Sequence, residues 1–435
     1  MSGESPKDTG DLTRRATGYG LFMLTIVYAF NFIDRQILVI LQEPIKQEMG
    51  LSDAQLGLLS GFTFALVYIT AGIPIAWWAD RGNRRNIIAL SLTVWSGMTA
   101  VSGLAQNYTH LLLARIGVGL GEAGGSPPAH SMISDYYPPE RRGFAMGIYS
   151  SGLHFGVLLG LLIGGWISQY YGWRMAFFAV GLPGVLFAVV FFFTVKEPQR
   201  GRWESGDHSE HKPTLRETLG VLAGFPSFWL ISIGAGLAAF IGYGSANFSP
   251  SYLMRNHGLT VGEVGTLLSL LGGGGGMAGA LLGGYLADRL GKHDKRWYLW
   301  VPALAGLLAV PIGLPFLLSD NTTVVLMTIP IVVMLQNTYI GPVIAVSHAL
   351  VPPAMRALTS AILFFILNLI GLGLGPLTVG LLSDAYQAHF GVDSLRYAML
   401  TAVVLSSPSI LLFFLGARRL RVDLDAKNTS ADHPR

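Results

Sequence analysis

Residues 54–85 read AQLGLLSGFTFALVYITAGIPIAWWADRGNRR, an apolar run that ends in a cluster of charges. The first 26 of these residues carry no ionised side chain, whereas Asp80, Arg81, Arg84 and Arg85 crowd the last six. In a helix, 26 residues extend about 39 Å, which exceeds the roughly 30 Å hydrocarbon core of a bilayer. The stretch therefore predicts a transmembrane helix followed by a charged loop.

Long uncharged runs recur along the whole chain. Ten runs of about 20 residues or more lack an ionised residue, at 54–79, 86–106, 143–169, 175–195, 218–254, 264–287, 297–319, 321–355, 357–383 and 397–417. Two further apolar segments, 17–41 and 109–134, contain ionisable side chains. The runs do not alternate between polar and apolar residues, as the strands of a membrane barrel would. The sequence thus predicts an all-α integral membrane protein with twelve transmembrane helices.

The loop charges predict how these helices are oriented. An even number of helices places both termini on one side, and that side holds 23 Lys and Arg against 4 on the other. Because positively charged loops stay in the cytoplasm, both termini are expected there, with the chain in the plasma (inner) membrane. Charged residues are only 12% of the 435 residues and cysteine is absent. This composition excludes disulfides, thiolate zinc sites and a nucleic-acid-binding chain.

Two loop motifs occur twice, in the same order. ADRGNRR at 79–85 recurs as ADRLGK at 287–292, and PPERRG at 138–143 recurs as PPAMRA at 352–357, with offsets of 208 and 214 residues. Duplication of a six-helix unit explains both offsets, so the chain is expected to form two six-helix pseudo-repeats. The expected parts are a cytoplasmic tail (1–16), an N-terminal bundle (17–195), a cytoplasmic linker (196–217), a C-terminal bundle (218–417) and a cytoplasmic tail (418–435).

These motifs resemble those of the major facilitator superfamily. Asp288-Arg-Leu-Gly-Lys292, preceded by Gly284, is similar to the loop motif of that family. The first copy departs from it, because Ala76 replaces the glycine of the motif. Arg115-x-x-x-Gly119 is similar to the second family motif, on helix 4. The resemblance implies the major facilitator fold and secondary active transport by alternating access.

A narrower resemblance rests on three short motifs. Asn31-Phe-Ile-Asp34-Arg35-Gln36, together with residues 79–84 and 119–123, resembles the spinster branch, whose members move lipids such as sphingosine phosphate or lysophospholipids. Anion:cation symporters share the Asn-x-x-Asp-Arg pattern and are the competing branch.

Four ionised residues lie inside the predicted spans, namely Asp34, Arg35, Arg115 and Glu122. An Asp or Arg at mid-helix costs about 2.5–3.5 kcal/mol, so an intramembrane charge indicates function. Low dielectric favours a neutral carboxyl and a nearby Arg favours a carboxylate, so movement of the Arg would toggle protonation. We therefore expect Asp34 and Glu122 to carry protons. A static ion pair that holds helices 1 and 4 together is the alternative.

The remaining candidates bind substrate or close the cytoplasmic side. Arg35 is expected to bind an acidic head group, because its planar donor fork matches phosphate or carboxylate. The predicted substrate-binding residues are Arg35, Glu122, Arg115, Tyr243, Asn247, Asn337 and Asn368. Charged loop residues are expected to form a gate, by ion pairs or by capping a helix across the interface, with topology alone as the alternative. The predicted gate residues are Asp80, Arg81, Arg84, Arg85, Asp135, Arg142, Asp288 and Arg289.

The sequence favours a proton-coupled secondary active transporter of an amphipathic, anionic or zwitterionic lipid-like substrate. An organic-anion:proton symporter or a multidrug-type exporter is the alternative in the same class. A channel is the alternative from another class, although two unlike halves do not supply a ring of pore charges. No enzyme activity, cofactor or metal is expected, since no Walker lysine motif or metal-ligand spacing occurs. The expected partners are substrate, protons and membrane lipids, without nucleic acid, and the protein is expected to be a monomer.

Overall fold

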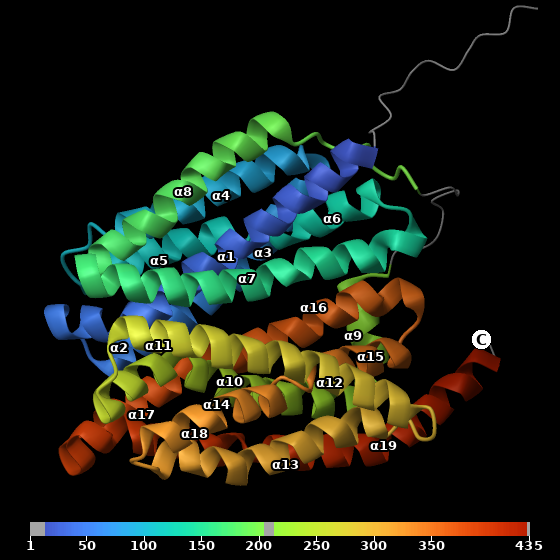
Figure 1. Ribbon diagram of the computed structural model, residues 1–435. Helices are drawn as coiled ribbons and strands as arrows, with labels where there is room; N and C mark the ends of the chain where they lie inside the picture. The colour runs from blue at the N-terminus through green and yellow to red at the C-terminus, as the bar shows by residue number, and fades with distance from the viewer. Residues whose placement is uncertain (1–13, 204–212, 433–435) are drawn as a thin grey trace, which may run out of the picture.

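A computed structural model describes residues 14–203 and 213–432 of the chain. The described residues are almost entirely helical and contain no β-strand. They form two helical bundles, one from each half of the chain, which are stacked on each other (Figure 1). The rest of the predicted N-terminal tail (1–13) and of the predicted linker (204–212) lies outside the described residues.

The bundles are built from the following elements. The N-terminal bundle contains α1 (Arg14–Met49), α2 (Asp53–Gly57), π-helical η1 (Leu58–Phe62), α3 (Thr63–Arg81), α4 (Arg84–Ser102), α5 (Tyr108–Glu122), α6 (Ser126–Tyr136), α7 (Pro139–Tyr171) and α8 (Trp173–Thr194). The short α9 (Leu215–Ala223) leads to the C-terminal bundle. That bundle contains α10 (Pro226–His257), α11 (Val261–Leu267), π-helical η2 (Leu268–Gly272), α12 (Gly273–Gly291), α13 (Trp297–Leu318), α14 (Thr322–Gln336), α15 (Ile340–Leu350), η3 (Pro353–Met355), α16 (Arg356–Leu367), π-helical η4 (Asn368–Leu374), α17 (Gly375–Phe390), η5 (Gly391–Asp393), α18 (Ser394–Ser406) and α19 (Pro408–Asp432).

These elements make up twelve membrane-spanning units within the described residues. Nine stretches are long and apolar enough to cross a bilayer, and the last of them, Pro353–Asp425, contains two such units in succession. The α4 helix and the α5–α6 pair run within the N-terminal bundle and complete the set (Figure 1). The twelve-helix, two-bundle prediction is therefore confirmed.

Regularly spaced glycines bring α1 and α7 together. A methyl group on Gly152 would lie 2.5 Å from the backbone oxygen of Thr25, and one on Gly156 would lie 2.4 Å from that of Ala29. A methyl group on Gly160, four residues further on, would lie 2.9 Å from the Cβ atom of Gln36 in α1. Small residues at this spacing let helix backbones pack closely in lipid, where van der Waals contact drives association.

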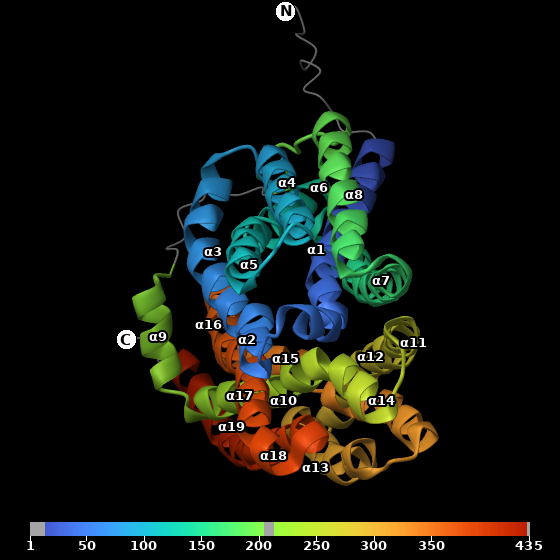
Figure 2. The same cartoon turned by 90° about the vertical axis from the view of Figure 1, so that its left-hand side faces the viewer.

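The two bundles are closed against each other at one end. We call the end that holds the start of α1, residues 195–203 and the end of α19 the linker end, and the opposite end the far end. At the far end, α2 lies against α17 (Figure 2), and a methyl group on Gly57 would lie 2.3 Å from the backbone oxygen of Pro376. Toward the linker end, a methyl group on Gly72 of α3 or on Gly284 of α12 would meet no atom within 4 Å. The described contacts thus seal the far end.

Two boundaries differ from the sequence prediction. The C-terminal bundle was expected from residue 218, but this region belongs to α9, and the spanning helix α10 begins at Pro226. The tail expected from residue 418 continues α19 as far as Asp432. Asp423 in this extension accepts a 2.9 Å hydrogen bond from the backbone N–H of Ser227, so it caps the start of α10. Hydropathy does not predict this polar extension of α19, because its residues are too polar to be counted as part of a membrane span.

Candidate functional site

Two helices are interrupted at matching positions of the repeats. The α5 helix ends at Glu122 and α6 begins at Ser126, while α14 ends at Gln336 and α15 begins at Ile340, 214 residues later in both cases. The sequence predicted each pair as one continuous span. The first break follows from Gly124 and Gly125 and from two prolines at the start of α6, which have no N–H to continue the helix. Broken membrane helices leave backbone groups free to line a polar site.

Two buried carboxylates meet two arginines at the first break. Glu122 and Asp34 are fully buried, and Arg115 is 2% exposed. Arg35 Nε donates to Glu122 Oε2 over 2.6 Å, and Arg115 Nη1 donates to the backbone oxygen of Asp34 over 3.3 Å. Ser96 Oγ donates to Asp34 Oδ2 over 3.0 Å. The structure therefore brings together the four intramembrane charges that the sequence singled out.

This charged cluster is incompletely hydrogen-bonded. Asp34 Oδ1, Glu122 Oε1 and Arg115 Nε are buried without a hydrogen-bond partner in the described part of the chain. With both carboxyls ionised the four charges cancel, and protonation of either carboxyl leaves one excess positive charge. In a low-dielectric site that excess attracts an anion. The cluster can thus exchange protons, anions or both.

Aromatic rings surround the Arg35 guanidinium. Its Cζ lies 5.2, 4.7 and 5.2 Å from the ring centroids of Phe32, Phe64 and Tyr68. Its side chain is 20% exposed, whereas its partner Glu122 is completely buried. Arg35 therefore keeps its charge in an apolar setting by cation–π contacts and remains the accessible member of the pair.

The C-terminal bundle contributes fewer of the predicted contacts. Tyr243 of α10, in the other bundle, lies within electrostatic range of Arg35. Asn247 Nδ2 instead donates to the Tyr243 backbone oxygen over 2.9 Å, and Asn337 Nδ2 donates to that of Val333 over 2.8 Å. Asn368 is the first residue of η4. Substrate binding by these three asparagines stays a prediction.

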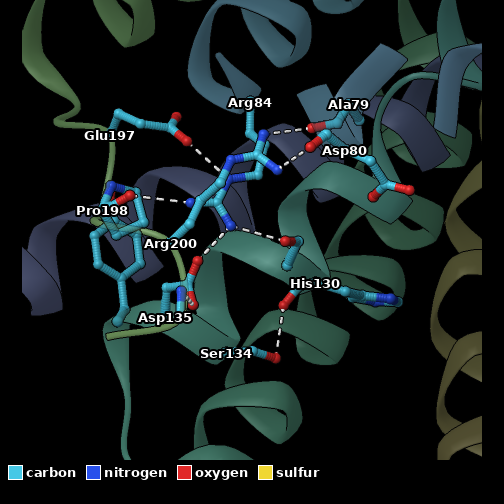
Figure 3. A network of polar contacts seen from close by, with 12 residues as sticks. Ala79, Asp80, Arg84, His130, Ser134, Asp135, Glu197, Pro198 and Arg200 are labelled. Carbon is cyan, nitrogen blue, oxygen red and sulfur yellow. Dashed lines mark hydrogen bonds and ion pairs between the residues drawn. The ribbon is translucent and has the colours of Figure 1, made fainter. Parts of the chain in front are cut away.

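The predicted gate residues at the linker end contact their own bundle and the start of the linker. Arg84 is 1% exposed and donates to Glu197 Oε1 over 2.7 Å, to Ser131 Oγ over 2.7 Å and to Asp135 (Figure 3). Arg200 donates to the backbone oxygens of Ala79, Asp80 and Gly82 at the end of α3.

The other predicted gate residues have partners in their own bundle or at the start of the linker. Arg81 stacks on the Trp77 ring and Arg142 donates to two backbone oxygens that precede α7. Asp288 accepts from the Tyr298 hydroxyl over 2.8 Å, and Arg289 donates to the Tyr285 hydroxyl over 2.9 Å. The backbone N–H of Arg85 donates to Glu197 over 2.8 Å. A gate across the two bundles at this end stays a prediction.

Sequence reasoning missed a polar cluster at the far end. Arg255 of α10 donates two 2.7 Å hydrogen bonds to the Asp53 carboxylate and one of 2.7 Å to Glu43. Lys46 and Ser383 each donate to Asp53 over 2.6 Å. In the sequence these residues are charges at the ends of predicted spans. Such charges are common in membrane proteins, so they did not indicate a cluster.

Comparison with known proteins places this geometry in a family. The model of the Major Facilitator Superfamily matches residues 24–376. An MFS-type efflux pump of Mycolicibacterium smegmatis is 33% identical over 411 residues, which cover 92% of this chain and 93% of that protein. A cis,cis-muconate transport protein of Acinetobacter baylyi is 28% identical over 328 residues, which cover 71% of this chain and 75% of that protein.

A solved structure is similar over almost the whole length. The bacterial homologue of the human lysosomal transporter Spinster, in an inward-facing and unoccupied conformation, has a TM-score of 0.88 and 34% sequence identity. The similarity covers 94% of this chain and 99% of that one. The spinster-like resemblance of the sequence motifs is confirmed, and the chain belongs to the major facilitator superfamily.

Proposed function

We propose that this protein is a proton-coupled secondary active transporter that moves an amphipathic, anionic or zwitterionic lipid-like molecule by alternating access. As a member of its family it is a multi-pass membrane transporter and not an enzyme. The observation that carries the proposal is the pair of Arg35 with the buried Glu122 at the break of α5 and α6, next to Asp34 and Arg115. With the linker end in the cytoplasm, the described conformation is the inward-facing one.

Proton coupling follows from competition for one guanidinium. An acidic substrate group that reaches Arg35 competes with Glu122, which holds Arg35 Nε at 2.6 Å. Once displaced, the buried Glu122 carboxylate lacks a full set of partners, and protonation removes its uncompensated charge. Anion and proton therefore bind with positive cooperativity, which is reciprocal by linkage. Asp34 of α1 supplies a second exchangeable carboxyl, and Arg115 of α5 donates to its backbone oxygen over 3.3 Å.

The amphipathic character of the substrate rests on the residues around Arg35. Phe32, Phe64 and Tyr68 present rings to the guanidinium, and Tyr243 approaches from the other bundle. An acidic head group would meet the arginine while apolar parts would contact rings, which contribute dispersion and burial of apolar surface. The C-terminal bundle offers no comparable charge to the head group among the residues described here.

A smaller organic anion is the second candidate substrate. The muconate transport protein is a relative that carries such an anion by name, and Arg35 suits carboxylate and phosphate equally.

The deciding experiment is a thermal-stability screen of the purified protein with matched ligand pairs. We expect stabilisation by acidic amphiphiles and none by their neutral analogues. Stabilisation by short dicarboxylates alone would assign the protein to the organic-anion class.

A further inference from the structure

The first turn of one long helix is capped by a side chain from the other bundle. The α2, η1 and α3 segments form one continuous helix, Asp53–Arg81. Asp384 of α17 accepts from the backbone N–H of Asp53 over 2.9 Å and from that of Ala54 over 2.8 Å, using one carboxylate oxygen for each. A carboxylate at a helix N-terminus satisfies free N–H groups and complements the helix dipole. Asp384 therefore bonds the two bundles directly at the far end.

The repeat-related position holds a second cap of the same kind. The helix Val261–Gly291 begins on the C-terminal bundle, and the backbone N–H of Gly262 donates to Gln169 Oε1 of α7 over 2.8 Å. Gly262 follows Asp53 by 209 residues, and Asp384 follows Gln169 by 215. These offsets lie within one residue of the 208 and 214 residues that relate the two copies of the loop motifs. Each bundle thus caps one helix of the other, which a chance contact would not repeat.

The two caps differ in strength. The Asp384 cap lies beside the buried cluster in which Arg255 and Lys46 bind the Asp53 side chain, and its neighbour Ser383 donates to the same carboxylate. The Gln169 cap is neutral and makes a single bond of this kind. A charged acceptor forms hydrogen bonds roughly twice as strong as a neutral one. The α2–α17 contact is therefore the stronger of the two closures.

We propose that Asp384 and Gln169 are the far-end gate residues of the transport cycle, with Asp384 as the main lock. The inference rests on the proposed alternating access, because a far-end gate has to open for the site to face that side. Opening separates α17 from α2 and α7 from α11, so both caps break together. The closed conformation is then favoured by the bonds that only it contains, and a change in them shifts the equilibrium accordingly.

Because the chain contains no cysteine, two cysteines can be introduced and spin-labelled without first replacing native ones. Spin labels at Gln47→Cys and Ala388→Cys, both exposed at the far end, report the distance between α1 and α17 in purified protein without substrate. We expect Asp384→Ala to raise the ratio of open to closed distances by about tenfold or more, as for the loss of a charged hydrogen bond. Asp384→Asn keeps one acceptor and should shift the ratio less.

Two further variants make the result decisive. Gln169→Leu should shift the ratio in the same direction and by less than Asp384→Ala. Asp320→Asn removes a far-end carboxylate that is 87% exposed and pairs with Arg396 of its own bundle, so it should leave the distances unchanged. Equal distance distributions in wild type, Asp384→Ala and Asp384→Asn would overturn the gate. A shift as large in Asp320→Asn would do the same.

Failure of the gate and failure of the proposed function give different results. The distances are measured without substrate and at one pH, so they do not depend on the coupling ion or the substrate class. A shift in Asp384→Ala, together with wild-type uptake that is indifferent to a proton gradient, would keep the gate and reject proton coupling. Proton-driven uptake with unchanged distances in Asp384→Ala would keep the function and reject the gate.

Discussion

Replacing Glu122 with Gln tests the competition that links protons to anions. The amide keeps the shape of the side chain and still accepts a hydrogen bond from the charged guanidinium of Arg35, but it carries no charge and takes up no proton. The wild-type bond joins two charges over 2.6 Å at a fully buried carboxylate. A hydrogen bond to a charged group contributes about 1.5–3 kcal/mol. The wild-type bond, with both groups charged, belongs at the upper end of this range, and the bond from Arg35 to an amide belongs at the lower end. Displacement of the amide from Arg35 by an anion therefore costs roughly 1–2 kcal/mol less than displacement of the carboxylate.

This difference in free energy predicts how much the anion affinity changes in the variant and how that affinity depends on pH. Glu122→Gln should bind an acidic amphiphile roughly 5- to 30-fold more tightly than wild type at a pH where Glu122 is ionised. Wild-type affinity should fall as the pH rises, because deprotonated Glu122 competes for Arg35, and the variant should lose most of this dependence. Titration of purified protein between acidic and alkaline pH, with acidic and neutral ligands in parallel, measures both. Weaker anion binding in Glu122→Gln, or an unchanged pH dependence, would refute the competition.

Transport by the same variant separates coupling from binding. In proteoliposomes, Glu122→Gln should lose proton-driven accumulation but retain exchange of substrate across the membrane, since only the titrating group is gone. Glu48→Gln is the matched control, because Glu48 pairs with Arg174 at the far end and is half exposed. Normal proton-driven accumulation in Glu122→Gln would assign the proton to another residue, with Asp34 as the first candidate.

Three further predictions concern single arginine and aspartate residues. Arg35→Lys should weaken binding of the acidic amphiphile and Arg35→Ala should nearly abolish it, while a ligand without the acidic group is unaffected; equal loss for both ligands in a binding titration would make Arg35 a structural residue. Asp80→Asn should weaken closure at the linker end and shift the population toward the inward-facing state, which spin labels on the linker ends of α3 and α16 would detect as a longer distance. Arg84→Met should lower the thermal unfolding midpoint, because it leaves Glu197 and Asp135 without their buried partner, at a cost of about 3–5 kcal/mol. An unchanged midpoint would show that the linker and not Arg84 holds this end together.

The helices and the charged cluster were predictable because the bilayer limits what a sequence can do. A run without charges long enough to cross the hydrocarbon core has few alternatives to a helix. Charges inside such runs are rare and costly, so Asp34, Arg35, Arg115 and Glu122 stood out and were found together. Hydropathy averages over about one span, and it therefore missed the breaks after Glu122 and Gln336, which depend on local glycine, proline and capping.

The polar contacts at both ends were beyond sequence reasoning for a different reason. Asp384 and Gln169 are ordinary polar residues near helix ends, and their role depends on which helix of the other bundle lies opposite. The predicted gate motif has a similar ambiguity. Arg84 was expected to act across the bundles, but the structure buries it against Glu197 of the linker. The ion pairs of a loop arginine depend on the conformation of the transporter. The sequence therefore does not specify which partner the arginine has in a given conformation.

The two repeats carry different residues at related positions. The broken helix of the N-terminal bundle ends in Glu122, and that of the C-terminal bundle ends in Gln336 at the same repeat position. The cross-bundle cap shows the reverse, with Gln169 in the N-terminal bundle and Asp384 in the C-terminal one. A glutamine therefore stands in one repeat where a carboxylate stands in the other, at the centre and again at the far end.

In the proposed mechanism this difference separates coupling from closure. Proton and anion binding would act on the N-terminal bundle, whose broken helix ends in Glu122. The C-terminal bundle instead supplies Asp384 and Arg255, which hold the far end shut through α2. Binding at Arg35 can then influence the gate through the α2–η1–α3 helix, since this helix carries Phe64 and Tyr68 at the site and the capped N–H groups of Asp53 and Ala54 at its far end.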